Sequence, residues 1–159
     1  MIVGNLIGTD ASGLLPLGNA ADGIVASSGA SFNQIGNTNQ AARNVISTNG
    51  AAGIAVWGAD TTDNVVRGNL IGLGADGLTA LGNETSGMYL LNSTKRNVVG
   101  GSLPGARNVI SANGENGLGV WGAASDTTVS GNFIGTDATG TVARGNPLPG
   151  HCRWHRRPP

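Results

Sequence analysis

Short apolar segments separated by polar turns make up most of the chain. Each segment has three to five residues, is rich in Val, Ile and Leu, and is bounded by Gly or Asn. This alternation is typical of β-strands joined by turns. No stretch keeps an apolar period of 3.6 residues over ten residues, so the pattern predicts no helices in the repeated part of the chain.

The apolar segments fall into three sets that recur along the chain. A set led by Gly recurs at nearly even intervals, in residues 23–27, 53–57, 87–91 and 117–121. A set typified by NVV recurs at similar intervals, in residues 33–36, 64–68, 97–101 and 127–131. A set led by GN or RN occupies residues 4–8, 43–47, 68–72, 107–111 and 131–135. The unit is therefore about 32 residues long and supplies three strands.

Two slightly different units alternate, which gives the longer repeat GNLIGTDASGLLPLGN, GNLIGLGADGLTALGN and GNFIGTDATGTVARGN. A repeat of this kind predicts that each strand stacks on its equivalent one turn later, about 4.8 Å away. We therefore expect an all-β, right-handed single-stranded parallel β-helix of about four to five rungs with three parallel sheets. It should cover residues 1–150, and the tail HCRWHRRPP at 151–159, which breaks the repeat, is predicted to be disordered.

Asparagines recur at the start of the strands, where stacked side-chain amides can form hydrogen-bonded ladders along the axis. The predicted ladder residues are Asn5, Asn44, Asn69, Asn108 and Asn132 in one column and Asn33, Asn64 and Asn97 in another. Asn also tolerates the left-handed backbone conformation that sharp corners need. Glycines at 23, 53, 87 and 117 are likewise expected to mark corners with positive φ.

The phrases GNxIGTDxxGxxxxGN, GARNVIS and NVVGG resemble those of bacterial right-handed parallel β-helix repeat proteins in the pectin-lyase-like fold group. The resemblance extends from residue 1 to about residue 150. It implies the fold and suggests a segment of a longer solenoid in an extracellular or cell-surface protein. It does not imply one activity, because this fold carries lyases, hydrolases, epimerases, adhesins and passive stalks.

Charge and composition narrow the choice of partners. Without the three arginines of the tail, the nine basic residues fall to six against nine acidic ones, a net charge of −3. This balance argues against nucleic acid, which needs a basic surface. Every apolar run is far too short for a transmembrane helix, so no membrane span is expected. No signal peptide is visible in this chain, and its one cysteine, Cys152, lies in the tail.

Candidate catalytic and metal-binding residues are few. The best acidic cluster combines Asp60, Asp63 and Asp126 with Arg67, four residues after Asp63. Glycosidases need paired carboxylates and lyases need a basic group, but no His lies in the repeats and polar turns commonly contain Asp. We therefore assign no catalytic residue. Asp10 and Asp137 could offer a calcium ligand, but a site needs six to eight oxygens, so no cofactor is predicted.

Aromatic residues provide the candidate ligand-binding surface. Alternation along the Gly-led strands points Trp57 and Trp121 outward, with Tyr89 near them on the turn between. Trp57 and Trp121 are two turns, about 9.6 Å, apart, a spacing that suits stacking against the sugars of a polysaccharide. The competing interpretation is that the tryptophans only cover a corner.

Three functions thus remain open from the sequence. The first is a structural or adhesive, non-catalytic β-helix segment, whose partner is the rest of a longer repeat protein. The second is a carbohydrate-binding surface on the same scaffold. The third is a polysaccharide lyase or glycoside hydrolase. Regular repeats favour the first, the tryptophan column favours the second, and converging carboxylates would favour the third.

Overall fold

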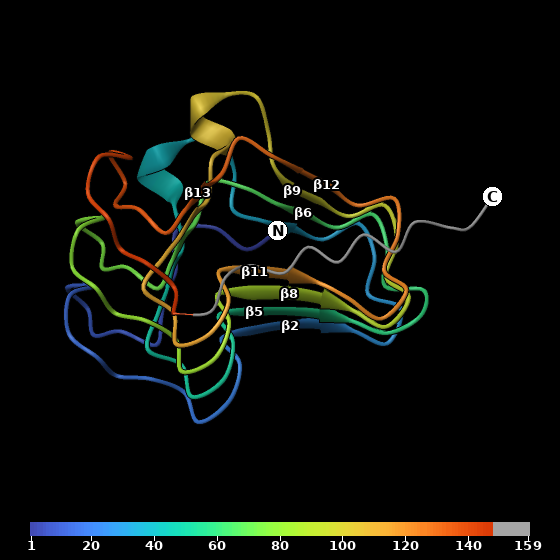
Figure 1. The fold of residues 1–159 in the computed structure, drawn as a ribbon, viewed down its shortest axis with the longest axis horizontal. Coiled ribbons are helices and arrows are strands. Elements are labelled where there is room, and N and C mark those ends of the chain that lie inside the picture. Colours follow the sequence, from blue (N-terminus) through green and yellow to red (C-terminus); the bar gives the residue numbers. More distant parts are fainter. Residues whose placement is uncertain (148–159) are drawn as a thin grey trace.

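The computed structural model describes residues 1–147, which wind into a parallel β-helix with three sheets (Figure 1). The β1 sheet comprises β1 (Leu6–Ile7), β4 (Val45–Ile46), β7 (Leu70–Ile71), β10 (Val109–Ile110) and β13 (Phe133–Ile134). The β2 sheet comprises β2 (Ile24–Ser27), β5 (Ile54–Trp57), β8 (Met88–Leu91) and β11 (Leu118–Val120). The β3 sheet comprises β3 (Gln34–Ile35), β6 (Val65–Val66), β9 (Val98–Gly100) and β12 (Thr128–Ser130).

Every strand pair in these sheets is parallel, and equivalent residues of successive turns lie opposite each other. In the β2 sheet, for example, Ile24 pairs with Ile54, and Ile54 pairs with Met88. The predicted all-β parallel helix with three sheets is therefore confirmed. The predicted tail at 151–159 lies outside the described residues.

The core is the inside of the coil, and it is filled by one face of every strand. Ile46, Ile71 and Ile110 of the β1 sheet have no exposed surface, and they pack against Ile54 and Met88 of the β2 sheet. Alternation along the strands sends every second side chain inward. Burial of each such side chain contributes roughly 1.5–3 kcal/mol, so successive turns stabilise one another.

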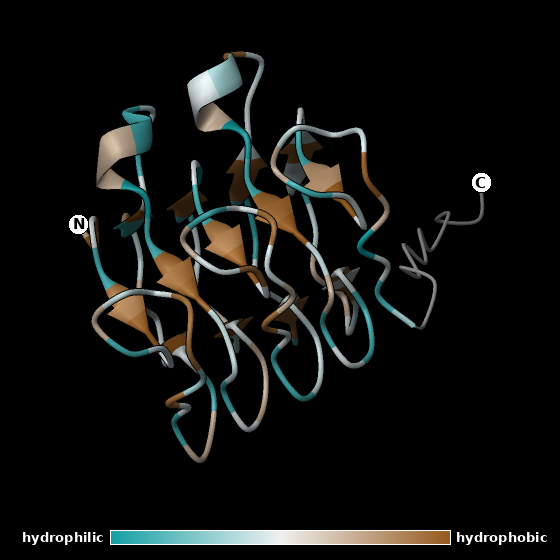
Figure 2. Ribbon diagram, turned by 90° about the vertical axis from the view of Figure 1, so that its left-hand side faces the viewer, coloured by the Kyte–Doolittle hydropathy of each residue, from teal (hydrophilic) through white to brown (hydrophobic). Residues whose placement is uncertain are grey.

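A second apolar cluster lies on the outer face of the β1 sheet, outside the coil. Val45, Leu70, Leu73 and Val109 are all buried there. The longest connectors of the repeat, loops 8–18, 72–82 and 135–145, lie beside this face, and two of them contribute Leu73 and Ala138 to the cluster. These loops also bond to one another two turns apart, because the N–H of Ala75 donates to the carbonyl of Gly13 at 2.9 Å. Figure 2 shows the hydrophobic strands stacked along the axis with the equivalent loops in rows beside them.

Two three-residue 3-10 helices depart from the prediction of a helix-free repeat. They are η1 (Gln40–Ala42) and η2 (Pro104–Ala106), and both precede a strand of the β1 sheet. The side chain of Asn39 caps η1 by accepting from the N–H of Ala41 at 3.1 Å. Helices this short have no apolar period of their own, so hydrophobic patterning cannot detect them.

Both predicted asparagine ladders are present. In the column that starts at Asn5, each side-chain amide donates to the side-chain carbonyl of the next turn, at 2.8–3.0 Å, as far as Asn132. The second column runs from Asn33 through Asn64 to Asn97 at 3.0–3.1 Å. It ends there because Thr127 stands where the next asparagine would. Accordingly, the buried Nδ2 of Asn97 has no partner among the described residues.

A third ladder was not predicted. It joins Asn19, Asn49, Asn83, Asn113 and Asn146, with amide-to-carbonyl distances of 2.8–3.1 Å. It lies between the loops and the β2 sheet. The signal was present in the sequence, because the longer repeat ends in GN three times and TNG and ANG supply the intervening turns.

The expected left-handed corners were assigned to the wrong residues. Gly23, Gly53, Gly87 and Gly117 do not have positive φ, and neither do the ladder asparagines. These glycines are needed for space instead. A Cβ on Gly87 would lie 2.5 Å from Cγ2 of Ile110 and 2.7 Å from Nδ2 of Asn113. The glycine column therefore leaves room for the third asparagine ladder.

Non-glycine residues occupy one column of left-handed corners, just before the β3 sheet. Its members are Phe32, Asp63, Arg96 and Asp126, with φ between 53° and 58°. They share a backbone conformation although they are of three residue types, Phe, Asp and Arg. Within residues 1–147, no helix has the length and hydrophobicity that a membrane crossing requires.

Candidate functional site

The outer face of the β2 sheet carries the predicted aromatic residues. Trp57 is 40% exposed, and Trp121 and Tyr89 are partly exposed. Trp57 pairs with Leu91, whereas Tyr89 pairs with Ala55 and Gly119. The N–H of Trp121 donates to the carbonyl of Leu90, which continues the register. The two tryptophans thus share a column with Leu91 between them, and Tyr89 stands in the neighbouring column rather than in theirs.

The aromatic rings partly cover this face of the sheet. A Cβ on Gly119 would lie 2.1–2.4 Å from three atoms of the six-membered ring of Trp121, so the indole occupies the space above Gly119. Ala55 also points outward, yet it has no exposed surface. Together with the half-exposed Val25, these side chains form a continuous apolar area, which we call the aromatic surface (Val25, Trp57, Tyr89, Leu91 and Trp121).

One polar contact fixes the edge of the aromatic surface. The hydroxyl of Tyr89 lies 3.5 Å from Oδ2 of Asp22, and Oδ1 of Asp22 accepts the N–H of Ala52 at 2.9 Å. Burial, and then the negative charge of Asp22, raise the pKa of Tyr89. The phenol of Tyr89 therefore stays neutral and can donate to Asp22. This contact directs the ring toward the two preceding turns of the coil.

The weak catalytic candidates do not form one cluster. Asp63 makes a two-pronged ion pair with Arg96 of the next turn, at 2.8 Å from Nε and 2.7 Å from the terminal nitrogen. The hydrogen bond from Arg96 is the main cause of the lowered pKa of Asp63. Asp126 follows one turn later in the same column, where its charge helps to raise the pKa of Arg96.

Asp60 and Arg67 are not part of this ion pair. Asp60 is an exposed turn residue whose carbonyl accepts from the hydroxyl of Ser31. Arg67 leaves the far end of β6, and its buried Nε has no partner among the described residues. The sequence placed Arg67 near Asp63 by its separation of four residues, but an extended chain carries residues that far apart to opposite ends of the strand.

The acidic residues of the long loops accept hydrogen bonds from their own loops. Asp10 accepts from the hydroxyl of Ser12 and from the N–H groups of Leu14 and Leu15 at 3.1–3.2 Å. Asp76 binds its own loop in the same way, although it stands two residues later in the repeat.

Asp137, the other calcium candidate, also binds Thr139, Thr141 and Val142 of its own loop. Among residues 1–147, no three His, Cys, Asp or Glu side chains come together as a group that could hold a metal ion.

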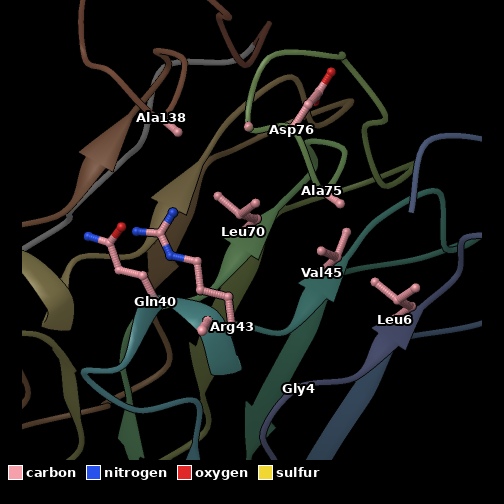
Figure 3. A pocket seen from close by; sticks show the side chains of 11 residues that line it. Gly4, Leu6, Gln40, Arg43, Val45, Leu70, Ala75, Asp76 and Ala138 are labelled. Atoms are coloured by element: carbon pink, nitrogen blue, oxygen red, sulfur yellow. The ribbon is translucent and has the colours of Figure 1, made fainter. Parts of the chain in front are cut away.

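Sequence reasoning missed a groove on the outer face of the β1 sheet. It has a volume of about 360 Å³ and lies between η1 and the loop tips around Asp76 and Ala138. Leu6, Val45 and Leu70 form its floor, and Arg43 and Gln40 extend along one wall (Figure 3). Arg43 directly precedes the segment NVIS in the sequence. It is a full turn of the coil away from Asp76 along the chain, so nothing in the sequence indicated that the two would line the same groove.

Comparison with known proteins yields no match for this chain among protein-family models, curated proteins or solved structures.

Proposed function

We propose that this chain is a structural, non-catalytic segment of a β-helix that serves as a stalk or adhesive module of an extracellular or cell-surface protein. The observation that carries the proposal is the asparagine ladder from Asn19 to Asn146, which runs through every turn without interruption. Such ladders make each turn a template for the next, and they suit an extended, stiff element whose length grows with the number of repeats.

The use of the acidic residues supports a non-catalytic role. Asp10, Asp76 and Asp137 hold loops, Asp22 accepts a main-chain N–H, and Asp63 is paired with Arg96. Catalytic carboxylates instead converge on a shared cleft with separated pKa values. The resemblance of the repeat phrases to bacterial β-helix proteins of the pectin-lyase-like group does not separate enzymes from stalks, but it motivates the extracellular assignment.

The stalk proposal is tested by adding turns. Extra copies of residues 4–67 inserted before Gly68 should each add two turns, about 9.6 Å of length, in small-angle X-ray scattering. Each copy should also raise the denaturation midpoint, because every added turn brings new interfaces. Constant length, or aggregation of the extended chains, would count against a stalk.

An enzyme assay completes the test. The chain is incubated with neutral and acidic polysaccharides, and the release of chain ends is measured. We expect none. Cleavage that disappears in Asp63→Asn or Asp126→Asn would replace the structural proposal with a lyase or hydrolase.

A second candidate function is carbohydrate binding at the aromatic surface. It is favoured by Trp57, a large aromatic side chain that is 40% exposed on the outer face of the β2 sheet. Trp121 lies two turns away in the same column, so a neutral or weakly charged glycan would run along the axis and stack on both rings. The affinity should be weak, with a Kd on the order of 10⁻³ to 10⁻⁴ M.

Tryptophan fluorescence can test this candidate once the third tryptophan is removed. In a Trp154→Phe background, only Trp57 and Trp121 report on the aromatic surface. Titration with a panel of oligosaccharides should change the emission, and Trp57→Ala should abolish binding. Val129→Ala, an exposed apolar change on the β3 sheet, serves as the control. An unchanged spectrum with every sugar leaves only the structural function.

A further inference from the structure

The groove on the outer face of the β1 sheet contains a cation without a counter-charge. The guanidinium of Arg43 is half-buried against η1, its Nε is enclosed, and none of its nitrogens donates a hydrogen bond within residues 1–147. In Figure 3 the guanidinium lies between the side chains of Gln40 and Leu70. An arginine without an acceptor favours an anion that enters the groove and reaches its terminal nitrogens.

Arg107 is the repeat equivalent of Arg43, and its guanidinium has partners within the protein. Its Nε donates to the carbonyl of Gly131 at 3.0 Å, and its guanidinium lies 3.9 Å from the centre of the Phe133 ring. Arg43 has Leu70 in place of that ring, because Leu70 and Phe133 are equivalent residues of β7 and β13. The substitution removes the aromatic face and leaves Arg43 available for an external anion.

The nearby charges define which anion fits. Burial lowers the pKa of Arg43, and the positive charge of Arg107 lowers it further, so the two cations are close enough to repel each other. Asp76 also lines the groove, but its oxygens accept from Leu78 and Thr79 of its own loop. In Figure 3 its side chain points away from the guanidinium. Arg43, Arg107 and Asp76 together carry a net charge of +1, which a single negative charge balances and a dianion exceeds.

We propose that this groove binds a small organic monocarboxylate, with Arg43 as the residue that holds the carboxylate and the exposed side of Leu6 as the contact for its apolar part. Guanidinium and carboxylate are planar and match in two parallel hydrogen bonds. A volume of about 360 Å³ lies within the range of small-molecule sites. The site is separate from the aromatic surface, which is on another sheet, and the proposal does not depend on the stalk function.

Butyrate is a suitable probe, and butyramide is its uncharged counterpart. Butyrate is titrated at low ionic strength, where ion pairing is least screened, and the guanidinium Nε–H resonances are followed by NMR. We expect the Arg43 resonance to shift with a Kd on the order of 10⁻³ M, while butyramide leaves it unchanged. Inorganic phosphate at a pH where it is a dianion should bind more weakly than butyrate.

Two matched variants locate the site. Arg43→Met keeps the apolar stem and should weaken butyrate binding roughly ten- to a hundredfold, as expected for the loss of a charge-assisted bond. Arg107→Met removes a more distant positive charge and should weaken butyrate binding clearly less than Arg43→Met does. Circular dichroism shows whether both variants keep the fold. An unshifted Arg43 resonance, an equal response to butyramide, or equal affinity in Arg43→Met would each overturn the proposal.

Discussion

The side-chain amide of Asn49 donates to the side-chain carbonyl of Asn83 at 2.8 Å, and both residues are almost completely buried. The same carbonyl oxygen of Asn83 also accepts the main-chain N–H of Asn49 at 3.1 Å. One side-chain carbonyl thus accepts hydrogen bonds from both the side chain and the backbone of the asparagine one turn before it. Because each turn repeats this bond, removal of a central asparagine leaves partners unsatisfied on two turns.

The position of an asparagine in its ladder should therefore decide its contribution to stability. Asn69→Ala removes a fully buried amide that accepts from Asn44 and donates to Asn108. We expect the free energy of unfolding to fall by roughly 1–3 kcal/mol, measured by urea denaturation. Asn5→Ala, at the exposed end of the same ladder, should cost clearly less. Equal costs for the two variants would mean that the asparagines act as solvated residues.

The glycine column gives a prediction about space rather than backbone conformation. In Gly87→Ala the new Cβ would lie 2.5 Å from Ile110 Cγ2, so the core must shift. We expect a loss of about 1–3 kcal/mol in the same denaturation experiment. Gly145→Ala is the matched control, because nothing lies within 4 Å of its Cβ position and its φ is not positive. If both substitutions have the same effect, close packing is not the reason for glycine at position 87.

The fold could be predicted from the sequence because a parallel β-helix repeats its environment at every turn. Equivalent residues such as Ile46, Ile71 and Ile110 meet the same neighbours, so the periodicity of the apolar residues encodes the register directly. The ladders from Asn5 and Asn33 followed from the same argument. The ladder from Asn19 was missed because its members occur in loops and in turns with different flanking residues.

Features without a repeated residue type could not be predicted. The left-handed corner before the β3 sheet is occupied by Phe32, Asp63, Arg96 and Asp126, three different residue types that share only their place before the NVV-type segments. The groove at Arg43 depends on the small difference between Leu70 and Phe133, two apolar residues that hydrophobic patterning treats alike. Asp63 pairs with Arg96 and not with Arg67. This pairing depends on the stacking of successive turns, which brings the equivalent corner residues Asp63 and Arg96 side by side.

Asp137 should make stability depend on pH. Burial raises its pKa, but hydrogen bonds from Thr139, Val142 and Thr141 outweigh that effect, so the pKa lies below the ordinary value of 3.8. A lowered folded-state pKa means that the stabilisation is fully present above the unfolded-state pKa. It is then lost as the pH falls through the folded-state value.

The melting temperatures of the protein and of Asp137→Ala should therefore differ at neutral pH, and the difference should begin to shrink near pH 3.8 and continue to shrink as the pH falls through the folded-state pKa. Asp137→Asn provides the control, because its amide oxygen can still accept from Thr141 and Val142 but does not titrate in this range. On acidification, the melting temperature of Asp137→Asn should fall less than that of the unsubstituted chain. A constant difference between the parent and Asp137→Ala at all pH values would show that the carboxylate charge is unimportant.

The contact between Arg107 and Phe133 should contribute a measurable coupling energy. The guanidinium carbon lies 3.9 Å from the ring centre, within the distance at which a cation is attracted to an aromatic face. At a partly exposed site this attraction is worth about 0.5–1 kcal/mol. A double-mutant cycle with Arg107→Met and Phe133→Leu isolates it, because methionine keeps the apolar stem and leucine recreates the environment of Arg43.

The cycle is measured by urea denaturation, with Arg43→Met and Phe133→Leu as the control cycle. The Arg107 cycle should give a coupling of about 0.5–1 kcal/mol that changes little with added salt, since the ring is uncharged and the contact is close. The control cycle should give a coupling near zero, because the residue equivalent to Phe133 beside Arg43 is Leu70 of β7, two turns away from Phe133. Coupling of the same size in both cycles would indicate a general loosening of the β1 sheet rather than a specific contact between Arg107 and Phe133.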